Sequence, residues 1–152
     1  MELLDEKSAI ESEIAEHGVC ATVTAGESMR PLFRTHKDAV VLKKPDREFK
    51  KYDAVLYKSP MGRYVLHRVI GRRGDILIIR GDNTYKKEYV RSDSVIAYMI
   101  SFNRGGKHYD VDSRGYKSYC ILWNFIYPVR YTVHKVLSLM RWMKRKIFGK
   151  KK

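Results

Sequence analysis

Apolar and polar residues alternate over several short stretches of the chain, a pattern that is typical of β-strands with one face in a core. These stretches are separated by turn-forming residues and cover residues 19–25, 39–42, 53–58, 63–70, 76–80, 94–102 and 109–111. Six or seven short strands at this spacing predict a mainly β domain. The Ser-Pro-Met-Gly sequence at residues 59–62 is a turn signal that joins two of the strands as a hairpin.

Two further segments have helical rather than alternating spacing. In residues 2–17 a short apolar stripe recurs at helical positions, and Gly18 follows as a stop signal. From Val129 to Ile147, apolar residues recur every three or four positions, and basic residues cover much of the remaining surface. Pro128 either breaks the apolar segment before it or opens this helix. The pattern as a whole predicts a mainly β fold with a short N-terminal helix and a basic amphipathic C-terminal helix.

The charge of the chain is concentrated in its last quarter. The net charge is +14, but residues 114–152 hold 11 of the 31 Lys and Arg residues and none of the 17 Asp and Glu residues. Residues 1–113 hold the other 20 basic and all 17 acidic residues, which leaves them only +3. We therefore expect one domain over residues 1–113, including the N-terminal helix, and a basic amphipathic tail over residues 114–152.

The tail predicts an interaction with an anionic membrane surface through residues 128–152, because it combines an apolar stripe with many cations. Arg130, Lys135 and Arg141 interrupt any segment that could cross a bilayer. One alternative is a helix packed on its own domain with a solvated basic face. Binding to nucleic acid is another, although no specific nucleic acid is expected.

The N-terminus and the cysteines bear on where the protein works. Residues 1–16 are acidic and have no long apolar run, so neither a secretory signal nor a transmembrane anchor is evident. Cys20 and Cys120 match neither a metal-binding spacing nor a disulfide framework, which favours unpaired thiols in a reducing compartment. We expect a cytoplasmic or peripheral membrane protein that requires no metal and no organic cofactor.

Three short segments carry the residue types of an activated serine nucleophile. The turn Gly-Glu-Ser-Met-Arg-Pro presents Ser28. His67 lies between two valines on one face of a predicted strand, where burial favours the neutral imidazole that a general base needs. The turn Gly-Asp-Asn adds the carboxylate of Asp82. Each segment alone also fits a structural role, but a hydroxyl, an imidazole and a carboxylate together are the components of a serine-type catalytic site.

The same three segments resemble the motifs of the signal peptidase I superfamily, which also contains the self-cleaving repressor domains, over roughly residues 19–100. The serine turn is similar to the nucleophile motif, and Gly-Asp-Asn is similar to the third motif. His-Arg-Val at residues 67–69 resembles the archaeal and endoplasmic-reticulum branch, in which a His is the general base instead of a Lys. The resemblance implies a mainly β fold and peptidase activity, with Ser28 as the nucleophile and His67 as the base.

Two acidic residues compete for the third position, where a carboxylate would accept a hydrogen bond from His67 and fix its tautomer. Asp82 is the first choice because it belongs to the third motif. Relatives of the archaeal and endoplasmic-reticulum type carry further acids shortly after that motif, and residues 84–90 contain only Glu88. Glu88 is therefore the alternative. Arg68 is expected to be structural and to pair with an acid across the sheet.

These features predict a serine endopeptidase that removes a signal or leader segment from a precursor peptide or protein. By the resemblance, cleavage follows a small residue. The spanning N-terminal helix of the membrane-embedded relatives is missing, which adds a cytoplasmic leader peptide as a candidate substrate.

Two other functions are alternatives. A self-cleaving regulator of the repressor type would need a Lys in place of His67, and the Ala-Gly at residues 25–26 lies too close to Ser28 to enter the same site. A non-catalytic module would bind a membrane or nucleic acid through the tail alone.

Overall fold

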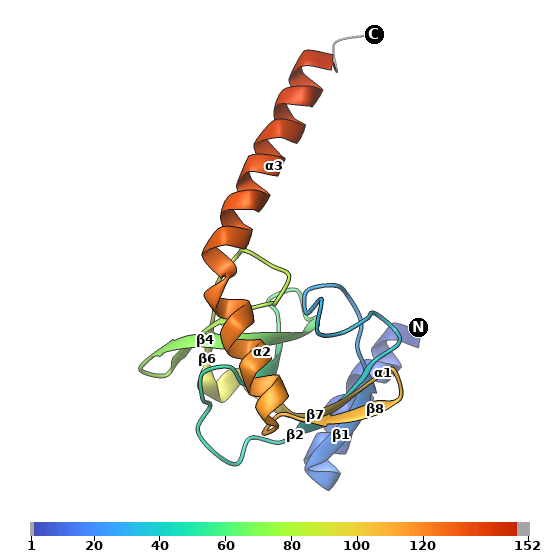
Figure 1. Cartoon of the computed structure of the whole chain (residues 1–152). Helices are drawn as coiled ribbons and strands as arrows, with labels where there is room; N and C mark the ends of the chain where they lie inside the picture. Colours follow the sequence, from blue (N-terminus) through green and yellow to red (C-terminus); the bar gives the residue numbers. More distant parts are fainter. Residues whose placement is uncertain (1, 149–152) are drawn as a thin grey trace.

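The computed structural model describes residues 2–148, and eight strands there form one antiparallel sheet that curls into a half-barrel (Figure 1). The elements in chain order are α1 (Glu2–His17), β1 (Val19–Val23), β2 (Ala39–Lys43), β3 (Ala54–Lys58), β4 (Tyr64–Arg73), β5 (Ile76–Arg80), β6 (Glu88–Arg91), η1 (Ser92–Ser94), β7 (Val95–Arg104), β8 (Lys107–Asp110), α2 (Arg114–Phe125) and α3 (Tyr127–Phe148). The strands lie in the order β1-β2-β7-β3-β4-β5-β6, and β8 pairs with β7. The predicted mainly β fold with helices at both ends is confirmed.

The centre of the sheet is buried on both faces. On β3, Ala54 and Leu56 enter one apolar cluster, whereas Val55 and Tyr57 enter another. Alternate residues of a strand point to opposite faces, so each face of β3 contributes to a different part of the core. The neighbouring strand β4 is also covered on both faces. Consecutive side chains of β4 can therefore both be buried, each on a different face of the sheet.

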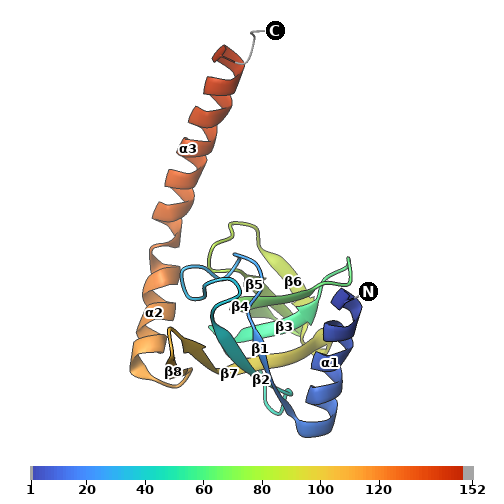
Figure 2. The ribbon, with the colours of Figure 1, turned by 90° about the vertical axis from the view of Figure 1, so that its right-hand side faces the viewer.

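Irregular pairing curls the sheet. The register shifts between β2 and β7, between β3 and β7, and between β4 and β5. An extra residue in one strand bends that strand and increases the local twist, so three such positions close the sheet towards a half-barrel. Figure 2 shows α1 and α2 on opposite sides of the curled sheet.

The helix α1 packs on the edge of the domain through its short apolar stripe. Its residue Ile14 is buried in the core with Cys20 of β1. On its outer side, Glu11 accepts a hydrogen bond from Lys58 Nζ at 3.1 Å, which ties α1 to the end of β3.

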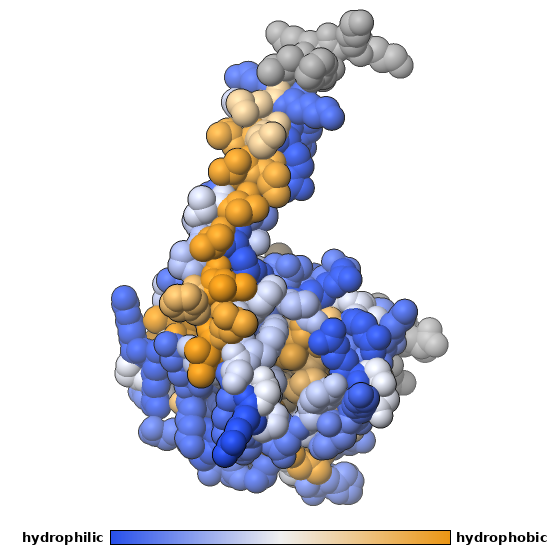
Figure 3. Space-filling model, in the orientation of Figure 1, coloured by the Kyte–Doolittle hydropathy of each residue, from blue (hydrophilic) through white to orange (hydrophobic). Residues whose placement is uncertain are grey.

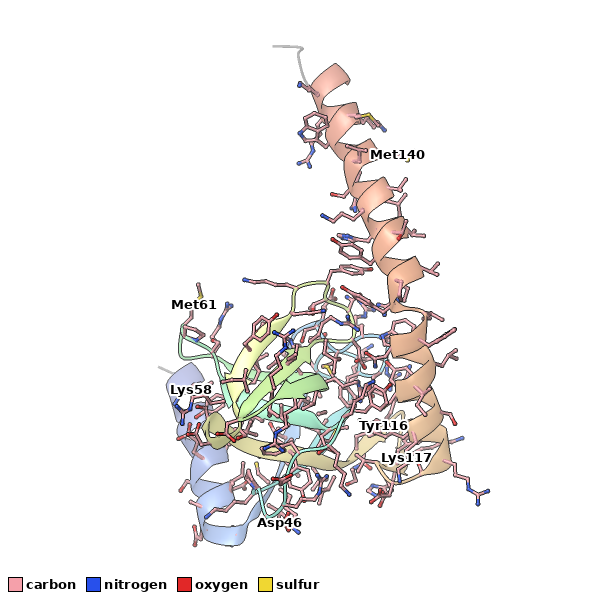
Figure 4. All side chains as sticks on the ribbon, turned by 90° about the vertical axis from the view of Figure 1, so that its left-hand side faces the viewer. Asp46, Lys58, Met61, Tyr116, Lys117 and Met140 are labelled. Atoms are coloured by element: carbon pink, nitrogen blue, oxygen red, sulfur yellow. The ribbon has the colours of Figure 1, made fainter. Side chains whose placement is uncertain are left out.

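The helix α2 belongs to the β domain, which differs from the predicted division at residue 113. Ser113 caps the helix by accepting a hydrogen bond from Tyr116 N–H at 3.3 Å. Tyr116 and Cys120 are buried, and Figure 4 shows Tyr116 on the side of α2 that faces the sheet. The charge count did not indicate this contact because the side chains that enter the core are uncharged.

The helix α3 extends away from the sheet (Figures 1 and 2). Pro128 lies in its first turn, so it opens the helix, and every residue from 135 to 146 is exposed. The alternative in which the amphipathic helix packs along its own domain is therefore wrong. Within residues 2–148, no helix combines the length and the apolar character that crossing a membrane requires.

Candidate active site

The turn after β1 presents Ser28 while its neighbours anchor the turn in the core. Met29, Leu32 and Phe33 are buried, whereas Ser28 is half-buried. Phe33 N–H donates to Met29 O at 3.2 Å and closes a helical turn directly after the serine. Gly26 enters the turn with a φ of 83°, which glycine adopts without a steric penalty. The sequence thus builds a rigid turn with one hydroxyl at its surface.

The loop after β5 lies directly against this turn. Asn83 N–H donates to Ser28 O at 2.7 Å, and the Asn83 side-chain amide donates to Glu27 O at 3.3 Å. A Cβ atom at Gly81 would lie 2.6 Å from Ser28 O and 3.0 Å from His67 Nε2. Only glycine permits this close approach. The structure therefore brings the Ser28 backbone and the His67 ring together beside Gly81.

His67 is buried on the face of β4 that sequence alternation predicted. It pairs with Val55 and is 4% exposed, and Val69 from the same face packs in the apolar cluster there. Burial lowers the pKa of His67, and the negative charges of Glu88 and then Asp82 oppose that shift. Burial prevails, so the neutral imidazole, which can accept a proton, is favoured.

The carboxylate of Glu88 faces the second ring nitrogen of His67. Glu88 Oε1 lies 3.5 Å from His67 Nδ1. The Tyr57 hydroxyl lies 3.5 Å from the same nitrogen and donates its hydrogen bond to Glu88 Oε2. The Tyr57 hydroxyl has one proton, which it donates to Glu88. A hydrogen bond between His67 and Glu88 therefore requires the proton of the imidazole to be on Nδ1. That tautomer leaves the lone pair on Nε2, beside Gly81.

The prediction that Asp82 accepts a hydrogen bond from His67 is not what the structure contains. The Asp82 carboxylate accepts from Arg68 Nε at 2.7 Å and from Arg68 Nη2 at 2.8 Å. Its Oδ2 atom also accepts from the Tyr119 hydroxyl at 2.9 Å. Those donors occupy the carboxylate, so the alternative, Glu88, holds the position next to His67.

Arg68 forms a buried structural ion pair, as expected for the neighbour of His67. Its side chain is fully buried, and that of Asp82 is 2% exposed. From Nη1, Arg68 also donates to Tyr52 O at 3.0 Å, to the Tyr116 hydroxyl at 2.9 Å and to Cys120 Sγ at 2.9 Å. The pair therefore ties β4, the loop after β5 and α2 together below the serine turn.

Sequence patterning missed the role of Tyr57 and the strand that carries Glu88, although Glu88 itself was the alternative for the third position. Glu88 begins β6, which pairs with β5 through Ile79. That pairing brings Glu88 to the face on which His67 lies. Tyr57 was assigned to a strand without a role. The sequence of β6, Glu-Tyr-Val-Arg, does not alternate between apolar and polar residues, so the alternating burial of this strand has no counterpart in the local pattern.

Two backbone N–H groups beside the serine lack an acceptor within residues 2–148. Throughout the described chain, the N–H groups of Ser28 and Met29 donate no hydrogen bond. In the same residues, no hydrogen bond joins Ser28 Oγ to the His67 ring. Catalytic contacts of this kind are often long without substrate and shorten in the substrate complex.

The described residues contain no group of three or more His, Cys, Asp or Glu side chains that could hold a metal ion. Comparison with known proteins gave no match, either to a protein-family model or to a curated protein. Ser28, His67 and Glu88 are therefore the residues from which a function can be inferred.

Proposed function

We propose that this protein is a serine endopeptidase that resembles signal peptidase I. Ser28 is the nucleophile, His67 the general base, and Glu88 the carboxylate that orients the base. The position of the His67 ring carries the proposal, because Nε2 lies beside Gly81 next to the Ser28 backbone while Nδ1 faces Glu88. An imidazole between a serine and a carboxylate is the arrangement that activates a serine hydroxyl.

The proposed reaction uses only groups of this chain. Ser28 Oγ attacks the carbonyl carbon of the peptide bond, and its proton passes to His67 Nε2. The N–H groups of Ser28 and Met29 stabilise the resulting oxyanion. His67 then gives the proton to the leaving amine, and water, activated by the same imidazole, hydrolyses the acyl group from Ser28. Glu88 stabilises the imidazolium that forms in each half of the reaction.

The substrate that we propose is an extended signal or leader segment of a precursor peptide or protein. β1 lies at one edge of the sheet and leads directly to the Ser28 turn. An edge strand offers unpaired backbone groups that can pair with an extended peptide. Val19 and Val23 of β1 are exposed, so apolar side chains are available beside that edge.

We propose a cytoplasmic or peripheral membrane location. Cys20 and Cys120 are both buried and unpaired. Burial raises the pKa of Cys20 to about 12, and it raises the pKa of Cys120 as well. Both thiols therefore remain protonated and unreactive, which suits a reducing compartment and gives no support to a disulfide.

The test is cleavage of a synthetic peptide library by the purified full-length protein, with the new termini identified by mass spectrometry. Ser28→Ala should lower the cleavage rate by several orders of magnitude, because the hydroxyl forms the new bond. The fold should persist, since the Ser28 hydroxyl makes no hydrogen bond within the described chain.

Ser118→Ala is the matched control, because Ser118 is an exposed serine of α2 outside the site. It should cleave like the wild type. Cleavage by folded Ser28→Ala at the wild-type rate would contradict the proposed nucleophile, and absence of cleavage by the wild type would favour a non-catalytic module.

A further inference from the structure

The helix α3 carries an exposed apolar stripe along one side. Val129, Val133, Val136, Met140 and Met143 recur at intervals of three or four residues, and each exposes between 41% and 66% of its surface. Figure 3 shows the apolar residues as a continuous band along the projecting helix. An uninterrupted exposed band of this length is unusual on a soluble monomer and is characteristic of a surface that binds a partner.

The apolar surface continues onto α2. Ile121, Leu122 and Phe125 are exposed on that helix, and Phe125 exposes 80% of its surface. Ile126 N–H donates to Leu122 O at 3.0 Å, and Arg130 N–H donates to Ile126 O at 3.1 Å. These bonds carry the helical path across the junction, so one apolar face runs from the β domain along α3.

Cations flank this face on both sides. At about 100° per residue, Arg141 and Lys144 fall on one flank of the stripe, and Lys135 and Lys146 fall on the other. No Asp or Glu occurs in residues 114–152. An apolar stripe between two rows of cations matches an anionic membrane surface. When such a helix lies in the membrane interface, its apolar side chains contact the acyl chains and its long basic side chains extend to the headgroups.

Two other occupants fit the surface less well. A second copy of the chain, paired as a coiled coil, would bring two strongly basic helices together without an acidic residue to pair with them. A nucleic acid would neutralise the cations but would leave the apolar stripe in water.

We infer that α3 and the exposed side of α2 dock together on an anionic lipid surface. This inference does not depend on the proposed cleavage reaction, and its test measures binding alone. It also connects the tail to the candidate site, because the first turns of α3 contact the loop after β5, and that loop contacts Ser28.

That contact is made by several side chains of the two helices. Arg130 Nη2 donates to Asp82 O at 2.8 Å, and Trp123 Nε1 donates to the same oxygen at 2.9 Å. The His134 ring stacks on Tyr85 with a centroid separation of 4.2 Å. A docked α3 would therefore hold the loop after β5, and the serine turn beside it, at a fixed position relative to the membrane.

The experiment is sedimentation of the full-length protein with lipid vesicles, and it uses two substitutions with the same charge change. Met140→Asp places the charge in the apolar stripe, whereas Ser138→Asp, two residues away, places it on the exposed opposite side of α3. Both positions are exposed, so both variants should fold. Figure 4 shows Met140 on the projecting part of α3, far from the sheet.

We expect strong binding to vesicles of phosphatidylcholine and phosphatidylglycerol in equal parts, and weak binding to phosphatidylcholine alone. Raising the salt from about 0.1 M to about 1 M should release part of the bound protein, because it screens the headgroup charge. Ser138→Asp should weaken binding several-fold, and Met140→Asp should weaken it by a further factor of about ten or more, because it also loses the apolar contact.

Three results would overturn the inference. The first is equal binding to both kinds of vesicle. The second is equal binding by Met140→Asp and Ser138→Asp, which would exclude the stripe from the contact. The third is a dimer in analytical ultracentrifugation that Met140→Asp dissociates, because the stripe would then be occupied by a second copy.

Discussion

His67 is the residue on which the proposed chemistry depends, because only its neutral imidazole can take the proton of Ser28. Burial lowers its pKa below the ordinary value. Activity should therefore be complete above that pKa and should fall as the pH decreases through a midpoint below about 6.5. The measurement is the pH dependence of kcat/KM for a cleaved peptide. An acid limb centred above about pH 7 would contradict a buried, neutral base.

Glu88 and Asp82 can be distinguished by the same pH profile. The negative charge of Glu88 raises the pKa of His67 more than that of Asp82 does. Glu88→Gln should therefore move the acid midpoint to lower pH and reduce kcat by about a hundredfold or more, because the base loses its orienting carboxylate. Asp82→Asn should shift the midpoint less. Wild-type cleavage by Glu88→Gln would leave a Ser-His dyad as the mechanism.

Gly81 is the residue at which the backbone of the Ser28 turn meets the His67 ring. In Gly81→Ala the new methyl group would overlap the Ser28 carbonyl oxygen, 2.6 Å away, and would crowd His67. We expect a loss of stability of about 1–3 kcal/mol and a larger proportional loss of activity, because the serine turn must move. Urea denaturation and the peptide assay measure the two effects. Gly115→Ala, where nothing lies within 4 Å, is the control and should lower neither the stability nor the activity.

At the level of the elements, the buried pair of Arg68 and Asp82 joins β4 to the loop after β5 and to α2. Arg68→Met should destabilise the fold by about 3–5 kcal/mol, because it leaves the Asp82 carboxylate buried without its cation. The double variant Arg68→Met/Asp82→Asn should be more stable than the single variant. In urea denaturation, Arg91→Met is the comparison, since its partner Asp93 is exposed and the pair should contribute nothing measurable.

The long strands could be predicted because the alternation of apolar and polar residues along them indicates which side chains enter the core. β5 was predicted at residues 76–80 and forms there, and β7 begins at Val95, within one residue of its predicted start. Ser28 and His67 were chosen from their motifs instead, and alternation predicted only that His67 lies on a buried face of its strand. The local sequence pattern is sufficient to predict a strand where burial of one face determines its conformation.

The third site residue could not be predicted in this way. β6 has four residues, two of them charged, and its strand conformation depends on pairing with β5. Long-range pairing of this kind leaves little local signal, so Glu88 looked like a loop residue. Asp82 looked like the partner of His67 because the sequence does not show that Asp82 is the acid with which Arg68 pairs.

On the scale of the whole molecule, the protein consists of a curled β domain and a projecting helix that share one contact region. α2 supplies Tyr116 and Cys120 to the core, while α3 leaves the domain after its first turns. Folding therefore requires α2 and the first turns of α3, whereas the rest of α3 is left for a partner. This boundary lies within α3 rather than at the change of charge near residue 113.

This division predicts opposite results for two truncations. Deleting residues 137–152 removes Met140, Met143 and much of the basic charge but keeps Arg130 and His134 at the loop after β5. The shortened protein should unfold at the wild-type urea midpoint and cleave a short soluble peptide within about twofold of the wild-type rate, because residues 137–146 are exposed. Its binding to anionic vesicles should be lost.

Deleting residues 114–152 should instead abolish cooperative unfolding. It removes Tyr116 and Cys120 from the core, and both of these side chains accept hydrogen bonds from the buried Arg68. A fully buried guanidinium that loses two of its acceptors and its covering helix is strongly destabilising. If the shorter deletion also lost cleavage of a soluble peptide while it remained folded, α3 beyond residue 136 would have to act at the site itself. If the longer deletion unfolded like the wild type, α2 would not be part of the folded domain.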